Sequence, residues 1–465
     1  AACFDEPVSS SAHTKENGGF VAVKKLLALC LCLLWIAPCA VAEERYAAIP
    51  ALLQFSQKEA PREKVQGDNY ILRTYPITAN AQVNAQLRAL IDEMTERGRP
   101  VLNGATSELM PAYLDVGANI FRTGTQWMSF LTIARSACER EQVYVDFDAR
   151  VYDMAAGERL TLADLFPADS PAWALLMQET AAQLSAYFPA ETPDAAALSA
   201  LCTREALENA AFTLTPAKLS LHFRADTLYP GHQTLMHVNV YYPAIRAYMT
   251  EAARQQTDNS RYKLIALTYD DGPARSYSMN LMHELRRYGA SATFFVVGTN
   301  IAKNHDVLCR EHDAGHDVAS HNYVHTYDDL TQDNILTWKS KFNAAILPII
   351  GVSPATMRAP GGHFKQFIAA QAGLPLIQWS VISGDAGSKD AGKISSRVIG
   401  SAKDGAVVLM HDINNKVSQY SASILPALEK KGFLCVTVEE LFSHYGVTLE
   451  GDQVYYDCTE EAQLR

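Results

Sequence analysis

The sequence lacks the clustered lysines and arginines with which nucleic-acid-binding proteins contact phosphates. Its 40 basic residues are outnumbered by 51 acidic ones, which gives a formal net charge of −11. We therefore expect no nucleic acid among its partners. With 465 residues and 48% hydrophobic content, the chain can bury more than one core, and its length predicts two or three domains.

Cysteines are few and widely spaced after residue 42, and none forms a C-x-x-C pair there. This spacing excludes both a dense disulfide scaffold and a thiolate zinc site. One or two disulfides remain open for an exported protein. The first candidate is a bridge between Cys435 and Cys458.

The apolar run at residues 26–36 is only 11 residues long, which is too short to span a bilayer. Lys24 and Lys25 precede it and the small residues 40–42 follow it, so the pattern predicts a signal peptide over 23–42. A retained membrane anchor is the alternative. We expect a secreted protein, extracellular or attached to the cell wall, with no membrane span after cleavage. We expect residues 1–22 to be a non-native or untranslated leader.

Residues 43–254 mix two periodicities, which predicts a smaller α+β domain. One stretch has apolar residues at helical spacing: Val83, Leu87, Leu90, Ile91 and Met94. Alternating patterns at 143–151, 219–223 and 236–242 predict strands. No titratable cluster stands out in this part. The polar residues 255–261 lack apolar periodicity and predict a linker.

After residue 262, short apolar runs alternate with amphipathic stretches of helix length. We expect strands at 264–270, 292–298, 317–320, 355–359, 375–382, 406–411 and 433–438. Alternation of this kind implies parallel strands, and seven repeats in about 180 residues predict an α/β fold, a distorted (β/α)7 barrel. The barrel is expected over 262–446, followed by a C-terminal tail at 447–465.

Two adjacent acids, Asp270 and Asp271, end the first expected strand. Neighbouring side chains of a regular strand point to opposite faces, so both acids can face one site only where the strand breaks. Gly272 and Pro273 supply such a break. A solvated acidic turn is the simpler alternative.

Further polar residues fall at other expected strand ends: His321 at the third, Arg358 at the fourth and His411 at the sixth. The active site of a β/α barrel lies at these ends, so we expect the residues to converge. His321 and His325 have the H-x-x-x-H spacing that places two imidazoles on one face of a helical turn. Each also has a simpler alternative: His321 and His325 as a surface pair, Arg358 as a surface cation, and His411 as a core histidine.

Two imidazoles and one carboxylate leave positions open for water, which is typical of a catalytic metal site. Asp271, His321 and His325 are the expected ligands. Zinc suits such a set best, and cobalt, nickel, iron and manganese can occupy similar ligands.

Four motifs now stand in order: TYDDGP at 268–273, SH-x-x-x-H at 320–325, RAPG at 358–361 and LMHD at 409–412. They resemble the successive motifs of the polysaccharide deacetylase, or NodB-homology, family of carbohydrate esterases. The resemblance covers about residues 262–442. It implies a metal-dependent hydrolase of acetylated sugars.

The resemblance also implies a role for each residue: Asp270 as general base, Asp271, His321 and His325 as metal ligands, His411 as general acid, Arg358 as the group that orients Asp270, and Leu409, Gly361 and Trp379 in the substrate pocket. Amide hydrolysis needs an activated water and a proton for the amine leaving group. Histidine is the side chain whose ordinary pKa lies closest to neutrality, which suits His411 to the second task.

Three positions depart from the family pattern. Gly361 stands where a bulky aromatic residue is usual, but glycine keeps the backbone N–H that helps to form the oxyanion hole. Ala386 stands where a pocket tryptophan is usual, and Ile382 where an aspartate usually supports the acid histidine. Without that carboxylate we expect a lowered pKa for His411 and a weak acid. The alternative is that Asp385 or Asp412 supplies the charge.

The function we expect is a secreted metal-dependent deacetylase of amino-sugar polymers, with peptidoglycan as the favoured substrate. The alternatives are a catalytically weak wall-binding or sensing protein and an esterase acting on O-acetylated sugars. Residues 151–166 and 229–240 resemble the extracellular domain of some wall-associated deacetylases and lysozyme-sensing anti-sigma factors. That resemblance implies wall or protein contact through the N-terminal domain, and a purely structural companion domain is the alternative.

Overall fold

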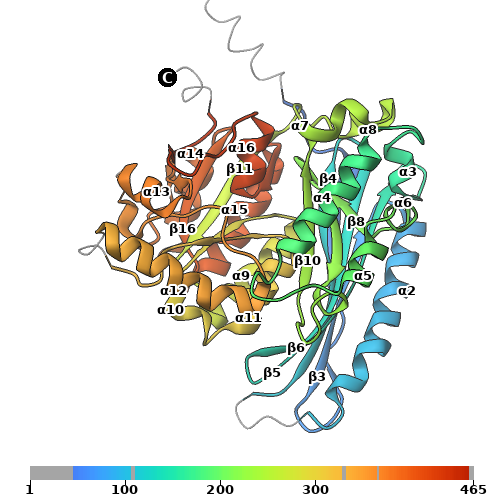
Figure 1. Ribbon diagram of the computed structural model, residues 1–465, viewed down its shortest axis with the longest axis horizontal. Helices are drawn as coiled ribbons and strands as arrows, with labels where there is room; N and C mark the ends of the chain where they lie inside the picture. The colour runs from blue at the N-terminus through green and yellow to red at the C-terminus, as the bar shows by residue number, and fades with distance from the viewer. Residues whose placement is uncertain (1–45, 106–109, 327–330, 364–365, 460–465) are drawn as a thin grey trace, which may run out of the picture. The chain divides into compact units, whose positions relative to one another are not determined.

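A computed structural model describes residues 46–105, 110–326, 331–363 and 366–459 (Figure 1). The chain divides into two compact units, Ala1–Ala47 and Ala48–Arg465. The expected leader and signal peptide lie outside the described residues. Within those residues, no helix has both the length and the apolar character needed to cross a membrane.

A long sheet forms the first half of the second unit. Its strands are β1 (Phe55–Glu59), β2 (Glu63–Lys64), β3 (Tyr70–Thr78), β4 (Tyr113–Thr123), β5 (Trp127–Cys138), β6 (Glu141–Asp153) and β7 (Glu158–Leu160). They lie in the order β1-β3-β4-β5-β6-β7, with β2 beside β3. β3 and β4 run parallel, and the other neighbours run antiparallel. β4 is buried along its whole length and β5 along all but its last residue, so neither shows the alternation that would have predicted it.

Helix α2 (Ala81–Gly98) lies along the outside of this sheet (Figure 1). The five apolar residues predicted to share one helix face are all buried, so this helix prediction is confirmed. The side chain of Asn80 caps the helix by accepting hydrogen bonds from the backbone N–H groups of Gln82 and Val83.

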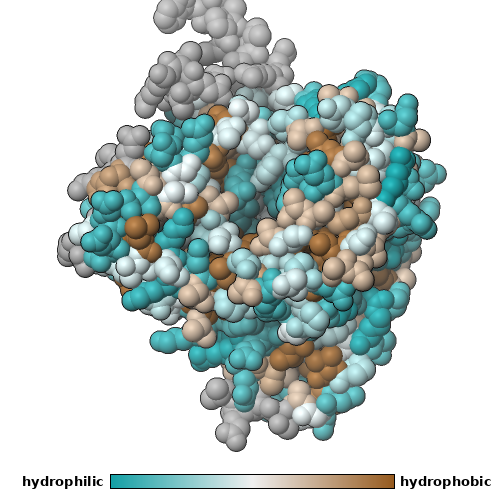
Figure 2. Space-filling view, viewed as in Figure 1, coloured by the Kyte–Doolittle hydropathy of each residue, from teal (hydrophilic) through white to brown (hydrophobic). Residues whose placement is uncertain are grey.

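Smaller elements complete the N-terminal region, by which we mean residues 48–256. The helices are η1 (Ala51–Leu53), η2 (Arg99–Leu102), α3 (Leu162–Leu165), α4 (Ala172–Ala186), α5 (Ala195–Leu201), α6 (Arg204–Glu208), η3 (Ala225–Thr227), α7 (Tyr242–Ile245), η4 (Arg246–Tyr248) and α8 (Glu251–Gln256). A second sheet has the order β10 (Leu235–Tyr241), β9 (Lys218–Arg224), β8 (Phe212–Leu214). Figure 2 shows weakly apolar side chains over α4 and α5, both rich in alanine.

The polar segment at 255–261 is not extended in solvent. It begins with the last two residues of α8, and Thr257 and Asn259 are buried. The Asn259 side chain donates to the carbonyl of Pro216 and accepts from the N–H of Gly124, at 3.0 Å in each case. This connection is therefore packed against the N-terminal region, although its composition is that of a linker.

The second half is a ring of parallel strands, which we call the barrel. Its strands are β11 (Lys263–Asp270), β12 (Thr293–Val296), β13 (Asp317–Ser320), β14 (Leu376–Ile377), β15 (Val381–Ile382), β16 (Ala406–His411), β17 (Phe433–Val436) and the peripheral β18 (Val454–Tyr455). Pairing runs from β11 through β12 and β13, through single bridges at Met357 to β14, and from β15 through β16 back to β11. The fold is thus the expected distorted (β/α)7 barrel. The distortion lies at Met357, where a full strand was expected at 355–359, and at 378–380, between β14 and β15.

Helices surround this ring, as the yellow to red ribbons of Figure 1 show. They are α9 (Arg275–Tyr288), α10 (Gly298–Ile301), α11 (His305–Asp313), α12 (Gln332–Ile350), η5 (Pro360–Gly362), α13 (Gln366–Ala372), α14 (Ala391–Ser401), α15 (Val417–Lys430) and α16 (Val438–His444).

The barrel strands bury both faces, one toward the helices and one toward the interior. Along β11, Ile265 packs among helix residues, whereas Ala266 packs with interior residues of β12 and β16. Cys435 contacts the helix-facing cluster and Cys458 belongs to the interior one. Cys435 is a free thiol, so the predicted bridge to Cys458 is wrong. The two residues lie on opposite faces of the strand layer, which places their sulfurs out of reach.

Candidate active site

The adjacent acids converge because the chain turns sharply between them. β11 ends at Asp270, and Asp271 has φ 79°, in the left-handed region that aspartate tolerates better than most residues. His321 Nε2 consequently lies 3.9 Å from Asp270 Oδ2 and 3.3 Å from Asp271 Oδ1. Gly272 is required at the turn, because a Cβ there would lie 2.1 Å from Asp412 Oδ2.

Asp271, His321 and His325 form a cluster whose ligand atoms all lie within 4.8 Å of one another. The Asp271 Oδ1 atom is 3.1 Å from His325 Nε2. The predicted helical turn between the two histidines is wrong. Residues 321–326 form no helix, and Asn322 turns the chain with φ 67°. The imidazoles converge through this loop.

The cluster has the donor set of a cation site. Asp271 Oδ1 is buried, and within the described part of the chain it accepts no hydrogen bond, although two imidazole nitrogens lie close to it. His321 Nδ1 lies 2.9 Å from the carbonyl oxygen of Arg358, which can only accept, so Nδ1 carries the proton and the lone pair of Nε2 faces Asp271. Lone pairs that face one another without a proton between them are unfavourable unless a cation lies among them. The residues therefore fit a divalent metal.

Asp270 is held by Arg358 from behind. The Arg358 guanidinium is 0% exposed, and its Nη1 donates to Asp270 Oδ1 and Thr268 Oγ1 at 2.7 Å each. Its Nε and Nη2 donate to the carbonyls of Ile377 and Gln378 at 3.0 Å. Burial lowers the pKa of Arg358, and the charge of Asp270 opposes this effect. Arg358 thus places Asp270 in one fixed orientation.

His411 ends β16 and is held by Asp385. The His411 Nδ1 atom lies 2.9 Å from Asp385 Oδ1, and the His411 backbone N–H donates to Oδ2 at 2.8 Å. Ser383 Oγ and Tyr420 Oη donate to the same carboxylate at 2.8 Å each. Burial opposes the charged form of His411, but the hydrogen bond and charge of Asp385 outweigh it and raise the pKa to about 9.

The prediction that His411 lacks a carboxylate partner and has a lowered pKa is therefore wrong. Ile382 is 55% exposed at the strand end, and the loop after it brings Asp385 to the imidazole. Asp412 is not the partner. Its buried carboxylate accepts a hydrogen bond from Ser278 Oγ, and burial, with the charges of Asp271 and Asp270, raises its pKa to about 7.

These residues surround one cleft of about 650 Å³ at the carboxyl ends of the strands. Of the nine predicted site residues, eight line it: Asp270, Asp271, His321, His325, Gly361, Trp379, Leu409 and His411. Arg358 lies behind Asp270. Gly361 has φ 67°, a conformation that glycine adopts without strain and a bulky aromatic residue does not. Ala386 and the exposed Ile413 also line the cleft, so a small side chain stands in its wall where the family pattern has a tryptophan.

The sequence offers Asp385 only as an alternative partner of His411 and gives no sign of Tyr420. The Tyr420 side chain reaches the site from α15, where it occupies a buried position of an amphipathic helix. Such a position in a sequence indicates core packing, so only the structure reveals its contact with Asp385.

Comparison with known proteins points to one family. A family model described as polysaccharide deacetylase matches residues 257–377. PgdA of Listeria monocytogenes, a peptidoglycan-N-acetylglucosamine deacetylase, is 36% identical over 206 residues, which cover 44% of this chain and 43% of that protein. This chain thus aligns with less than half the length of the Listeria protein. A solved structure described as T48 deacetylase with substrate is 32% identical and covers 43% of this chain and 98% of that chain, with a TM-score of 0.41.

A peptidoglycan-N-acetylglucosamine deacetylase of Bacillus cereus is 33% identical over 195 residues, which cover 39% of this chain and 89% of that protein. Nearly the whole of that relative is matched. The chain belongs to the polysaccharide deacetylase family.

Proposed function

We propose that the protein is a metal-dependent deacetylase that hydrolyses N-acetyl groups of an amino-sugar polymer, with peptidoglycan as the substrate. The observation that carries the proposal is the position of two proton-transfer groups, Asp270 and His411, around the Asp271 cluster in one cleft. The relatives from Listeria monocytogenes and Bacillus cereus are named for peptidoglycan, which supports this choice of polymer.

Asp271, His321 and His325 would hold the metal, with zinc favoured. When bound, a divalent ion acidifies water and polarises the acetyl carbonyl. Asp270, fixed by Arg358, accepts the proton of the attacking water. Leu409 and Trp379 line the part of the cleft that would receive the acetyl group, and the Gly361 N–H would stabilise the developing oxyanion.

His411 is the proton donor for the amine that leaves. Its Nδ1 is engaged with Asp385, so Nε2 is the atom free to deliver a proton into the cleft. A raised pKa keeps the imidazole protonated near neutrality, as a general acid requires. The absence of an aspartate at position 382 is therefore no reason to consider the protein a weak enzyme or a sensor, because Asp385 provides a carboxylate for His411.

The proposed substrate lies outside the cell, and the predicted signal peptide at 23–42 supports export. Contact with the wall or with another protein through the N-terminal region is part of the same proposal. It rests on the resemblance of residues 151–166 and 229–240 to wall-associated domains.

The test is acetate release from purified peptidoglycan, chitin oligosaccharides and acetylated xylan. Each substrate is assayed with the protein as isolated, after chelation, and after zinc, cobalt, nickel, iron or manganese is added back. We expect release from peptidoglycan that chelation stops and one metal restores. Release from acetylated xylan alone would identify an O-acetyl esterase. No release from any substrate with stoichiometric metal present would support a binding or sensing role.

A further inference from the structure

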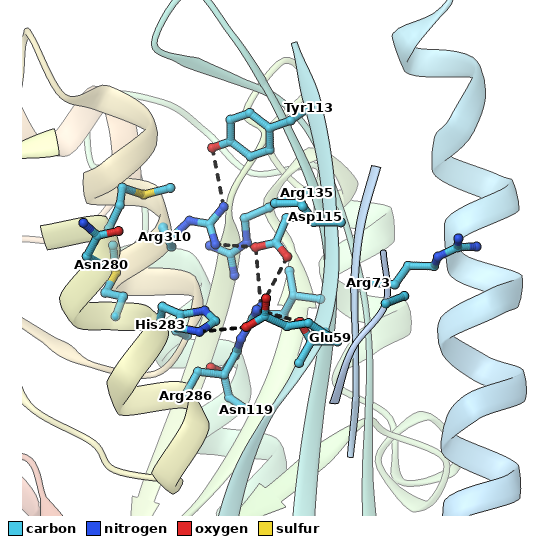
Figure 3. A pocket seen from close by; sticks show the side chains of 18 of the residues that line it. Glu59, Arg73, Tyr113, Asp115, Asn119, Arg135, Asn280, His283, Arg286 and Arg310 are labelled. Carbon is cyan, nitrogen blue, oxygen red and sulfur yellow. Dashed lines mark hydrogen bonds and ion pairs between the residues drawn. The ribbon is translucent and has the colours of Figure 1, made fainter. Parts of the chain in front are cut away.

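Three guanidinium groups and one carboxylate meet in a second pocket, between the long sheet and the barrel helices α9 and α11 (Figure 3). Asp115 comes from β4, Arg135 from β5, Arg286 from α9 and Arg310 from α11. None of them belongs to the catalytic cleft. The region gave no sign of a titratable cluster in the sequence, because its members are far apart along the chain.

Asp115 is already committed to two of the three arginines. Arg310 Nη1 donates to Asp115 Oδ2 at 2.5 Å, and Arg286 Nη1 lies 3.4 Å from each carboxylate oxygen. Arg286 also donates to Thr74 Oγ1 at 3.1 Å. Burial opposes ionisation of Asp115, but the guanidiniums outweigh it and hold its pKa well below the usual range. The carboxylate is thus ionised and contributes one negative charge against three positive ones.

Arg135 is the cation without a partner. It is 5% exposed, its Nη1 is buried without a hydrogen-bond partner, and among the described residues its side chain forms no ion pair. The negative charge of Asp313 raises the pKa of Arg135, but no hydrogen bond joins the two side chains. The Asp313 carboxylate instead accepts hydrogen bonds from Gln142 Nε2, Thr234 Oγ1 and the Leu235 N–H at 2.7–2.8 Å. Burial and the charge of Arg310 lower the pKa of Arg135 to about 10, which still leaves it charged near neutrality.

A buried, charged and unpaired guanidinium is unfavourable unless an anion reaches it. The pocket leaves room for one, with a volume of about 230 Å³, several times the ~30 Å³ that a water molecule occupies. Its walls include the apolar side chains Leu72, Ile133, Met279 and Met282. Glu59 and His283, 3.0 Å apart and partly exposed, lie at its solvent side. A ligand with an anionic group and a small apolar body fits these dimensions better than a bare ion.

We propose that this pocket binds a small organic anion through a carboxylate or phosphate group, with Arg135 as the anchoring cation. Arg286 and Arg310 complete the positive surroundings, and Asp115 holds both in place. A guanidinium offers two parallel N–H donors, which match the two oxygens of a carboxylate or phosphate. The proposal does not depend on the deacetylase reaction.

The test measures binding to the full chain by calorimetry at constant ionic strength. The probes are N-acetylalanine, its uncharged amide N-acetylalaninamide, and inorganic phosphate. We expect binding of N-acetylalanine but not of the amide, since the apolar bodies match and only the charge differs. Binding of phosphate in place of N-acetylalanine would assign the site to phosphate-bearing ligands. Failure of the wild-type protein to bind either anion would overturn the proposal.

Arg135→Met removes the charge and keeps an unbranched apolar stem, so it should weaken anion binding at least about tenfold. Arg159→Met, an exposed arginine of β7 in the same sheet, is the matched control and should bind as the wild type does. Equal binding by Arg135→Met and the wild type would show an adventitious anion elsewhere and refute the assignment. If Arg135→Met does not fold, Arg135→Lys keeps the charge but loses the two-pronged geometry, and it should also bind more weakly. Acetate release should be unchanged in Arg135→Met.

Discussion

The candidate catalytic cleft and the Arg135 pocket each bury a polar atom that has no hydrogen-bond partner among the described residues, and the side chains that carry these atoms differ in charge. In the cleft one such atom is Asp271 Oδ1, and in the pocket one is Arg135 Nη1, whose guanidinium, unlike that of Arg310, forms no ion pair with another described residue. In both places the neighbouring group of like charge is already paired, Asp270 with Arg358 and Arg310 with Asp115. A buried charge left over in this way indicates the sign of the ligand that completes the site. The comparison supports both proposals, a cation in the cleft and an anion in the pocket.

The largest expected effect is on metal binding in the cleft. Asp271→Ala, His321→Ala and His325→Ala should each abolish metal binding and acetate release, because two protein ligands compete poorly with water for the ion. The fold should survive, since the site lies at the mouth of the barrel. Metal content by mass spectrometry and circular dichroism check both statements, with Asp169→Ala, at an exposed position of the N-terminal region, as the control. Stoichiometric metal in two of the three variants would place the site elsewhere.

Asp270→Asn should have the next largest effect. It keeps the hydrogen bond to Arg358 but removes the carboxylate proposed as the general base, so turnover should fall by roughly 10²–10⁴-fold while metal is retained. Single-turnover acetate release on metal-loaded protein measures this loss. Near wild-type turnover with the metal confirmed would make Asp270 a turn residue and not a base.

Asp385→Asn should shift the pH dependence of kcat/KM and leave the fold intact. Asp385 raises the pKa of His411 to about 9, so the acid stays protonated up to alkaline pH, and the alkaline limb of kcat/KM reports the loss of that proton. Without the charge the pKa falls toward its ordinary value of 6.5, and the limb should move down by about one to two units. A bound metal lowers the pKa in both proteins, so the difference between them is the quantity to measure.

Ile382→Asp is the matched control for this shift. A second acid at this exposed strand end should leave the alkaline limb where it is, because Asp385 already occupies Nδ1 of His411. An upward shift in Ile382→Asp, with none in Asp385→Asn, would reverse the assignment of the supporting carboxylate.

The smallest expected effect is on stability, and it tests the anion side. Without added anion, Arg135→Met should raise the free energy of unfolding by about 1 kcal/mol, because it removes an uncompensated buried charge. Chemical denaturation in a buffer free of carboxylate and phosphate measures the change. A loss of stability would mean that Arg135 has a partner within the protein.

The sequence predicts the cleft well because most of its chemistry is local. The two acids and the Gly-Pro turn that lets both face the cleft are neighbours along the chain. The parallel pairing of the barrel strands brings His321 and His411 to the same end of the barrel as these acids. It predicts the histidine pair for the wrong reason, since a loop and not a helix joins them. Asp385 could not be chosen over Asp412 because the path of the loop after β15 decides which carboxylate meets His411.

The Arg135 pocket could not be predicted in the same way. Asp115 and Arg135 sit in strands buried on both sides, and the two arginines that contact Asp115 come from helices more than a hundred residues later. Isolated charged residues in long buried strands carry no spacing pattern that indicates a cluster. Only the packing of the sheet against α9 and α11 creates it.

The contacts of Arg358 determine how the protein tolerates substitution at this position. Its guanidinium donates to the carbonyls of Ile377 and Gln378, where β14 ends and the ring of strands is interrupted, and at the same time to Asp270. Lysine, with one nitrogen, cannot span these positions. Selection for a closed barrel and selection for turnover therefore act on the same side chain. A mutational scan scored by protein abundance should rank position 358 as strictly as a scan scored by activity, whereas His411 should stand out in the activity scan alone.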